Sequence, residues 1–334
     1  MVDGGSLHEG RTRLDAEGSN ALARAMGLLS DEWTLMLLRH AHRGFTRYSE
    51  FQAELPISNS VLSARLDLLV NESLFDKQIH HSGRLRSEYV LTPKGLGIWP
   101  ILVAIWKWER TWVPGYVFAT PALRHAVCGK EFIPHFCCVS CGDQVTAQEI
   151  SAQFGPAGGW ARSVPEARTR RRSQSRRQVE NSYFADTLTI WGNRWASAVV
   201  GAAFMGIVRF TDFRDLLGAP PGLLMQRLVV LCERGIMERV ETQEHPARPE
   251  YRLTAKGLDF FSVIHLTLQW AEEWYIDPLG AVLSTQHTTC GNPFVGRLVC
   301  DQCHAPLEHA DLILQSREKK FAPIGAEQQI GQPW

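Results

Sequence analysis

The chain has 334 residues, of which 45% are hydrophobic and 21% are charged. At roughly 100–200 residues per domain, this length predicts two or more domains with ordinary hydrophobic cores. The 35 basic residues balance the 35 acidic ones, which excludes a uniformly basic or acidic protein. The longest uncharged apolar run, Trp195 to Val208, is shorter than the roughly 18–20 residues that cross a bilayer, and the N-terminus has no apolar signal segment. We therefore expect a cytoplasmic protein with no membrane partner.

The sequence contains an internal duplication that aligns without gaps at a separation of 162 positions. Trp33 aligns with Trp195, and Lys94-Gly95 aligns with Lys256-Gly257. The repeat extends to a set of His and Cys residues that closes each copy. The repeated unit is about 135 residues long, which indicates duplicated domains, because solenoid repeats are only about 20–50 residues long.

The segment between the copies has a different composition. Residues 162–177 hold seven arginines, one glutamate and almost nothing to bury, so residues 151–180 are predicted to be a solvated linker. The arginines would either add sequence-independent affinity for phosphates or only keep a hinge soluble. Residues 313–334 are predicted to form a flexible tail.

Each copy begins with a predicted helix-turn-helix. In copy 1, residues 22–42 have helical spacing of apolar residues, with a fresh helix start at Ser30-Asp31-Glu32. A short amphipathic helix over residues 46–55 ends before Pro56, and a third helix runs from Ser58 to about Val70. Two short helices joined by a tight turn are typical of a helix-turn-helix.

A hairpin and a long helix complete the predicted copy. Residues 74–80 and 88–91 are apolar and aromatic and flank a basic tip at 81–86, and Thr92-Pro93 begins an apolar helix that reaches Trp112. The predicted fold class is α+β, mainly α: two tandem winged helix-turn-helix domains over 18–115 and 181–277, each with a C-terminal helix. We expect a small zinc ribbon after each, over 120–150 and 282–312.

These elements resemble the HxlR-type winged helix-turn-helix regulators. The resemblance rests on Trp33-Thr-Leu-Met-Leu-Leu-Arg, Arg47-Tyr-Ser-Glu-Phe, Leu62-Ser-Ala-Arg-Leu and Glu88-Tyr-Val-Leu-Thr-Pro-Lys-Gly, with the same set in copy 2, over about residues 20–115 and 182–277. It implies a prokaryotic, DNA-binding transcription regulator that pairs through its terminal helices, as a homodimer or as an intramolecular pseudo-dimer.

Copy 1 carries the residues predicted to contact double-stranded DNA. The N-terminal residues of a recognition helix meet base edges in the major groove, while nearby cations hold phosphates. The candidates for base contact are Ser58, Asn59, Ser60 and Ser63, and those for phosphate or minor-groove contact are Arg65, Arg84 and Arg86. The alternative is that the serines only cap a helix and that the two wing arginines are merely solvated.

Copy 2 departs from this pattern. Pro220-Pro-Gly-Leu-Leu-Met225 replaces the polar helix start, leaving Gln226 and Arg227 on the helix and Arg248 on the wing as candidate DNA contacts. An apolar helix start cannot make the hydrogen bonds that distinguish bases. We therefore expect copy 2 to bind DNA weakly or to serve mainly as the pairing partner of copy 1, on an asymmetric operator.

Each copy ends in a predicted zinc site. His-x2-Cys and Cys-x2-Cys knuckles separated by nine residues supply four ligands for a tetrahedral ion, and a glycine follows the first cysteine where such a knuckle turns. The expected sets are His125, Cys128, Cys138 and Cys141 in copy 1, and His287, Cys290, Cys300 and Cys303 in copy 2. Four protein ligands leave no open position, so up to two zinc ions would be structural.

Alternatives to these sites remain. His135, His304 or His309 could replace either histidine ligand, three thiolates could suffice, or the thiols could simply be buried and reduced. Cys137 and Cys232 lie outside the repeated sets and are predicted to be ordinary thiols. The tryptophans of the closing helices are predicted to pack in the core and the pairing surface.

The sequence therefore predicts a nucleoid-associated, non-enzymatic transcription regulator, with an unspecified small-molecule effector. The competing hypothesis is a zinc-containing protein-interaction adaptor of the transcription machinery that does not bind DNA sequence-specifically. No phosphate-binding glycine loop, nucleophile motif or open metal site indicates an enzyme.

Overall fold

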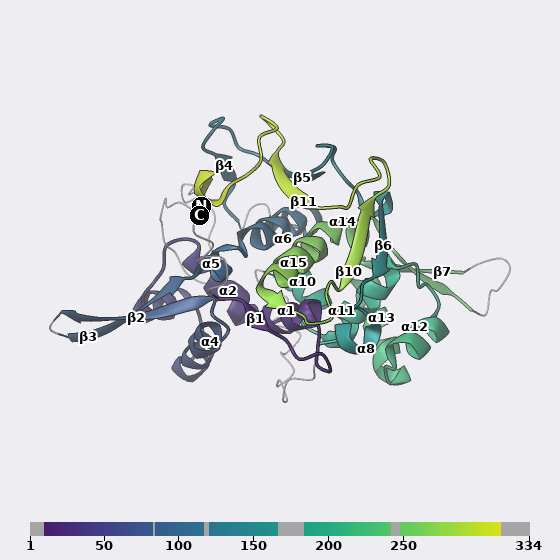
Figure 1. Cartoon of the computed structure of the whole chain (residues 1–334), viewed down its shortest axis with the longest axis horizontal. Helices are drawn as coiled ribbons and strands as arrows, with labels where there is room; N and C mark the ends of the chain where they lie inside the picture. Colours follow the sequence, from purple (N-terminus) through teal and green to yellow (C-terminus); the bar gives the residue numbers. More distant parts are fainter. Residues whose placement is uncertain (1–9, 83, 117–119, 166–183, 242–247, 315–334) are drawn as a thin grey trace, which may run out of the picture.

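The computed structural model describes residues 10–82, 84–116, 120–165, 184–241 and 248–314. Figure 1 shows two winged helices at opposite ends of an elongated molecule, with their hairpins extending left and right. Short strands that follow each winged helix lie together along the upper side. Of the predicted linker over 151–180, the structure describes residues up to 165, and of the predicted tail over 313–334, it describes residues 313 and 314.

Copy 1 contains the predicted helix-turn-helix. The segment predicted over residues 22–42 is two helices, and Asp31 is the N-cap of the second because its side chain accepts the Thr34 N–H at 3.1 Å. Leu62, Leu66 and Leu69 have no exposed surface, so they fix which face of the third helix looks outward. The helices are α1 (Ala21–Leu29), α2 (Glu32–Ala41), α3 (Tyr48–Glu54) and α4 (Asn59–Asn71).

The wing and closing helix of copy 1 also form, with one difference from the prediction. Strands β2 (Phe75–Ser82) and β3 (Arg84–Leu91) pair antiparallel, but the closing helix is divided into α5 (Pro93–Leu96) and α6 (Trp99–Trp112). Pro100 in the first turn of α6 cannot donate a backbone hydrogen bond to the preceding turn. Gly95 is required where α5 meets the wing, because a Cβ there would lie 2.2 Å from the Leu74 carbonyl oxygen.

Copy 2 repeats this order of elements. Its helix-turn-helix, wing and closing helices are α10 (Ala185–Trp191), α11 (Arg194–Phe204), α12 (Phe210–Leu217), α13 (Pro221–Glu233), β7 (Met237–Val240), β8 (Glu250–Leu253), α14 (Ala255–Asp259) and α15 (Phe261–Trp274). Gly257 repeats the close approach of Gly95, 2.2 Å from the Ile236 carbonyl oxygen. In the described part of the chain, no helix has both the length and the apolar content needed to cross a membrane.

The two copies pack together through their long closing helices. Helix α6 contacts α15, and each contributes a buried tryptophan to the opposite copy. The indole N–H of Trp108 donates to the Lys256 carbonyl at 2.9 Å, and that of Trp270 donates to the Lys94 carbonyl at 3.0 Å. These four residues are related by the 162-residue shift, so the copies form an intramolecular pair with approximate twofold symmetry.

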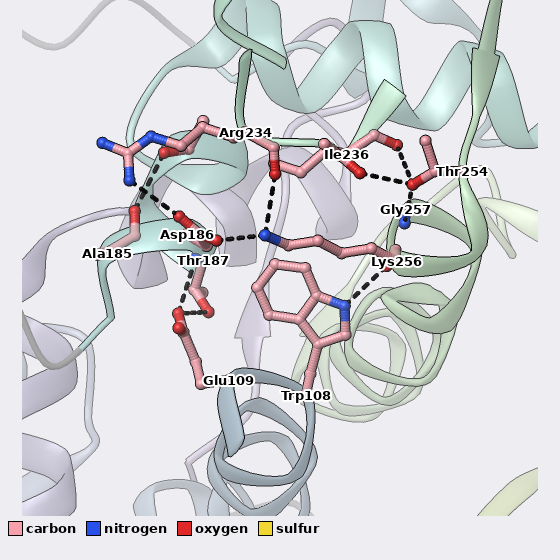
Figure 2. Close-up of polar contacts among 12 residues, drawn as sticks. Trp108, Glu109, Ala185, Asp186, Thr187, Arg234, Ile236, Thr254, Lys256 and Gly257 are labelled. Atoms are coloured by element: carbon pink, nitrogen blue, oxygen red, sulfur yellow. Dashed lines mark hydrogen bonds and ion pairs between the residues drawn. The ribbon is translucent and has the colours of Figure 1, made fainter. Parts of the chain in front are cut away.

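Polar contacts at this interface break the symmetry (Figure 2). The buried Glu109 of α6 accepts hydrogen bonds from the backbone N–H of Thr187 at 2.8 Å and from its hydroxyl at 2.7 Å. Beside it, Asp186 forms ion pairs with Lys256 and with Arg234. The position equivalent to Glu109 in copy 2 is Ala271, so copy 2 has no acidic counterpart.

Among the described residues, each ribbon strand after a winged helix pairs with a strand of the other copy, so the two predicted ribbon modules are joined instead of separate. Each of these pairings is antiparallel. Because α6 and α15 pack against each other, the segments that follow them lie close together, and short strands of one copy pair with the open edges of strands of the other. The pairs are β4 (Leu123–His125) with β12 (Leu312–Leu314), β5 (Pro134–Cys138) with β11 (Gly296–Cys300), and β6 (Ile150–Phe154) with β10 (Leu283–His287).

Two further elements join the copies. Strand β1 (Thr12–Arg13), before the first winged helix, pairs parallel with β9 (Tyr275–Ile276) after the second. Helix α8 (Trp160–Ser163) follows the ribbon strands of copy 1, and its Arg162 forms an ion pair with Asp277 at 2.8 Å. The N-terminal segment, the connection between the copies and the end of copy 2 are therefore linked directly.

The Glu109 contact predicts a pH-dependent stability. Burial raises the pKa of Glu109 to about 7 from an ordinary value of 4.5. The folded state thus binds this proton more tightly than the unfolded state, so stability falls as pH rises from about 4.5 to about 7, by about 3 kcal/mol in total. Urea unfolding at pH 5 and pH 8 should show a smaller difference for Glu109→Gln than for the parent protein. An unchanged difference would contradict this assignment.

Candidate nucleic-acid interface and metal clusters

Helix α4 presents a polar surface at its N-terminal end. Ser58 is its N-cap residue, and Ser58, Asn59, Ser60 and Ser63 are all exposed, as the sequence predicted. Leucines at 62, 66 and 69 hold the opposite face in the core. The arrangement is suitable for a recognition helix, since polar side chains at its start are free to meet base edges.

Helix α3 adds two residues to this surface that the sequence analysis missed. The Gln52 side-chain amide donates to the Asn59 side-chain oxygen, and the Tyr48 hydroxyl donates to the Asn59 backbone oxygen at 3.2 Å. The Ser63 hydroxyl donates to Tyr48 at 3.4 Å. Tyr48 and Gln52 are four residues apart, so helical spacing places them on one face of α3 and could have identified both.

Arg65 has a different environment from the one predicted. Its guanidinium makes two hydrogen bonds to the Asp31 carboxylate, at 2.8 and 3.0 Å, and its side chain is mostly buried. This paired geometry joins α4 to the N-terminus of α2 and occupies the cation. Arg65 therefore has a structural role in the helix-turn-helix, and its predicted contact with phosphates stays a prediction.

The wing of copy 1 extends well beyond the helices. Residues Arg84 and Arg86 pair across the hairpin with Ser82 and His80 near its tip, but their side chains lie outside the described residues. At the base of the wing, Arg47 forms an ion pair with Glu88 at 3.1 Å, which holds β3 against the start of α3. The predicted wing contacts thus have a suitable backbone position, and their role stays a prediction.

The equivalent surface of copy 2 is apolar. Leu223, Met225 and Val229 of α13 are exposed by 44%, 40% and 46%, which is unusual for large apolar side chains. Gln226 and Arg248 are exposed, as expected for candidate contacts. Near the start of α13, the exposed polar candidate is thus Gln226 alone among the described residues, whereas the start of α4 presents four.

Arg227 of copy 2 lacks the carboxylate that its counterpart Arg65 has. Asn193 stands at the position of Asp31, and its side chain caps α11 by accepting the N–H groups of Trp195 and Ala196. Arg227 donates to the Gln226 side chain at 3.0 Å, while its Nε is buried with no hydrogen-bond partner in the described structure. Burial lowers the pKa of Arg227.

The eight predicted metal ligands form two clusters, but each cluster contains ligands from both copies. The expected grouping within one copy was wrong, because the ribbon strands that carry the ligands pair between copies. Within each cluster, one ligand atom from every residue lies within 4.8 Å of the others. We name them cluster A, composed of His125, Cys128, Cys300 and Cys303, and cluster B, composed of Cys138, Cys141, His287 and Cys290.

The geometry of both clusters suits a tetrahedral zinc ion. In cluster A, the His125 Nδ1 lies 3.6 Å from the Cys128 sulfur and 3.3 Å from the Cys303 sulfur, and the Cys128 and Cys300 sulfurs are 3.9 Å apart. In cluster B, the Cys141 sulfur lies 3.4 Å from the His287 Nδ1. Zinc bonds of about 2.3 Å to sulfur and 2.0 Å to nitrogen separate tetrahedral ligand atoms by roughly 3.5–3.8 Å.

The local backbone supports the predicted knuckles. Gly129 and Gly291 have φ values of +70° and +72°, which side-chain-bearing residues rarely adopt. His309, one alternative ligand, instead contacts His42 at 3.0 Å between ring nitrogens. His135 and His304 belong to neither cluster, so His125 and His287 are the histidines that complete the sets.

The two remaining cysteines lie apart from the clusters. Cys137 is buried and Cys232 is half-buried, and burial raises the pKa of both thiols. A raised pKa reduces the thiolate fraction and hence the reactivity. Their environment agrees with the prediction that they are ordinary thiols.

Comparison with known proteins identifies the family. The family model described as HxlR-like helix-turn-helix matches residues 28–116 and 190–278, which together make up just over half of the chain. The chain belongs to this HxlR-like family. Each match covers one winged helix, which confirms both the predicted resemblance and the tandem duplication.

Several relatives match one copy of the unit. The uncharacterized HTH-type transcriptional regulator Rv3095 of Mycobacterium tuberculosis is 33% identical over 136 residues, covering 41% of this chain and 86% of the relative. YvaP of Bacillus subtilis, with the same description, is 36% identical over 91 residues, covering 27% and 84%. A third regulator so described, sll1512 of Synechocystis, is 28% identical over 93 residues, covering 28% and 69%.

The Arg65–Asp31 pair predicts a reciprocal effect in the two copies. Asp31→Asn keeps the helix cap but removes the carboxylate, so it should lower the free energy of unfolding by about 1–3 kcal/mol. Asn193→Asp, the matched change in copy 2, should raise it by supplying a carboxylate to Arg227. Urea denaturation of both variants measures the two changes. A neutral Asp31→Asn would show that the pair does not stabilise the fold.

Proposed function

We propose that this protein is a DNA-binding transcriptional regulator in which copy 1 reads the sequence of the operator. The observation that carries this proposal is the exposed polar start of α4 on a winged helix of the HxlR-like family. Its relatives are described as HTH-type transcriptional regulators. Ser58, Asn59, Ser60 and Ser63 would meet base edges in the major groove, with Gln52 available beside them and Arg84 and Arg86 on the wing.

Copy 2 would support this binding without reading many bases. Gln226 and Arg248 are its exposed polar candidates, whereas the start of α13 is mostly apolar. The operator would then be asymmetric, with specific contacts at one half and mainly backbone contacts at the other. Pairing of the modules occurs within the chain, so this arrangement does not require association of two chains.

The arrangement of the molecule is compatible with this role. Figure 1 shows α4 and α12 toward the lower side and the ribbon strands β4, β5 and β11 along the upper side. The ribbons therefore lie away from the proposed DNA-binding helix. The exposed apolar face of α13 would favour the adaptor hypothesis, since it could contact a protein partner. This hypothesis does not explain the exposed polar residues at the start of α4.

We further propose that clusters A and B each bind one structural zinc ion. Four protein ligands fill a tetrahedral site, so zinc would add folding free energy and leave no position for a substrate. The buried Nε2 atoms of His125 and His287 have no hydrogen-bond partner in the described structure, while their Nδ1 atoms face the sulfurs. Because each cluster draws ligands from both copies, each zinc ion would cross-link the two halves.

The DNA proposal predicts different losses in the two copies. Asn59→Ala and Ser63→Ala should each weaken specific binding about tenfold, since a good base contact contributes about 1–3 kcal/mol of discrimination. Gln226→Ala should change it by less than about threefold. An operator selected from random sequences, followed by gel-shift titration, provides the measurement. Thermal unfolding of each variant is the control, and equal losses in both copies would contradict the asymmetry.

The crossed clusters predict the zinc content of two double variants. Cys128→Ser with Cys300→Ser changes only cluster A, so about one zinc per chain should remain. Cys128→Ser with Cys138→Ser changes one ligand in each cluster, so both sites should lose affinity and the zinc content should fall toward zero. Elemental analysis of the dialysed full-length proteins distinguishes these outcomes. The reverse pattern would mean that each ion is held within one copy.

A further inference from the structure

A pocket lies where the N-terminal segment, α8 and the winged helix of copy 2 meet. Its volume is about 310 Å³, which is within the range of small-molecule sites. It is separate from the α4 surface and from both His/Cys clusters. The lining residues that bear on its chemistry are Glu17, Trp160, Val164, Arg194, Trp195 and Leu217.

Arg194 is the basic residue among those that line this pocket. Its guanidinium lies 4.4 Å from the centre of the Trp195 ring, and its Nε is buried with no hydrogen-bond partner in the described ranges. No residue of those ranges forms an ion pair with it. A buried guanidinium donor without an acceptor costs free energy, and an anion in the pocket would supply the missing acceptor.

This cation is specific to copy 2. The equivalent residue of copy 1 is Glu32, which follows the Asp31 cap. Copy 2 thus replaces an acidic pair at the helix start with Asn193 and Arg194. The change reverses the charge at the start of α11. The fold does not require a basic residue there, because copy 1 forms the equivalent helix with acidic residues.

One part of the pocket wall is aromatic and aliphatic, while polar groups, Glu17 and Ser19 among them, line the rest. Trp160 is held edge-on against Phe154, with ring centres 5.2 Å apart, and Val164 and Leu217 add aliphatic surface. Such a wall suits a flat ring, which packs on aromatic faces. The exposed Glu17 is the acidic side chain of the lining, and it makes no ion pair with Arg194.

Polar contacts position this wall independently of a ligand. Arg162 of α8 donates to the Gly18 carbonyl at 2.9 Å and forms an ion pair with Asp277 at 2.8 Å. The Asn20 side chain donates to the Ser163 hydroxyl at 2.8 Å. Helix α8 is thereby tied to the N-terminal segment, so the pocket is formed in advance and binding loses less conformational entropy.

We propose that this pocket binds a small aromatic carboxylate, with the carboxylate on Arg194 and the ring against Trp160, Val164 and Leu217. The site joins segments of copy 1 to helices α11 and α12 of the copy 2 winged helix. A bound ligand would therefore contact both the segment that connects the two copies and the winged helix of copy 2. The proposal concerns binding alone and does not depend on the proposed DNA-binding function.

Calorimetric titration of the full-length protein tests the proposal. Benzoate is the probe, and benzamide is its uncharged counterpart of similar shape. Benzoate should bind with a one-to-one stoichiometry and at least about tenfold more tightly than benzamide, because the charged hydrogen bonds to Arg194 require a carboxylate. Equal binding of the two compounds, or no heat from benzoate at millimolar concentration, would overturn the proposal.

Substitutions assign the binding to this pocket. Arg194→Gln should weaken benzoate binding at least about tenfold, whereas Arg214→Gln should not, because Arg214 is exposed on α12 and paired with Asp215. Leu217→Trp should also abolish binding by filling the space, and it leaves Arg194 in place if Arg194→Gln fails to fold. Retention of benzoate binding in a folded Arg194→Gln or Leu217→Trp protein would place the ligand elsewhere and refute the site.

Discussion

The packing of α6 against α15 is the constraint on which the rest of the structure depends. Trp108 and Trp270 each donate an indole N–H to a lysine carbonyl of the opposite copy, so the two winged helices are held in a fixed relation. The helices also determine where the chain continues beyond them. Their packing brings the ribbon strands of both copies together, and these strands form the mixed clusters of His and Cys ligands.

The interface is specific for one copy against the other. Glu109 of copy 1 bonds Thr187 of copy 2, but the residue of copy 1 equivalent to Thr187 is Ala25, which has no hydroxyl. If two copy 1 units paired, the buried Glu109 carboxylate would lose the hydroxyl hydrogen bond, and this loss would destabilise the pair. In copy 2, Tyr275 donates to Glu72 of copy 1 at 3.0 Å, whereas the equivalent of Glu72 in copy 2 is Arg234. Divergence has therefore made the two halves complementary instead of interchangeable.

The same divergence separates the surfaces of the two modules. Copy 1 retains polar side chains at the start of its recognition helix and an arginine neutralised by Asp31. The winged helix of copy 2 has an apolar helix face and two arginines, Arg194 and Arg227, whose buried Nε atoms have no partner in the described part of the chain. The unit with the apolar helix start is thus also the one whose two arginines have no carboxylate partner among the described residues, which is consistent with different tasks for the two halves.

The sequence by itself determined the duplication, the order of helices and strands, the polar face of α4 and the identity of all eight cluster ligands. These features depend on local periodicity, capping and spacing, which are properties of short stretches of the sequence. Only the tertiary structure decided how the ligands are grouped, that Arg65 pairs with Asp31, and that Glu109 meets Thr187. The ligand spacing is the same in both copies. It is therefore compatible with a site formed within one copy and equally with a site formed between the two copies. The packing of α6 against α15 decided between these groupings, and this contact joins residues about 160 positions apart, which no local pattern specifies.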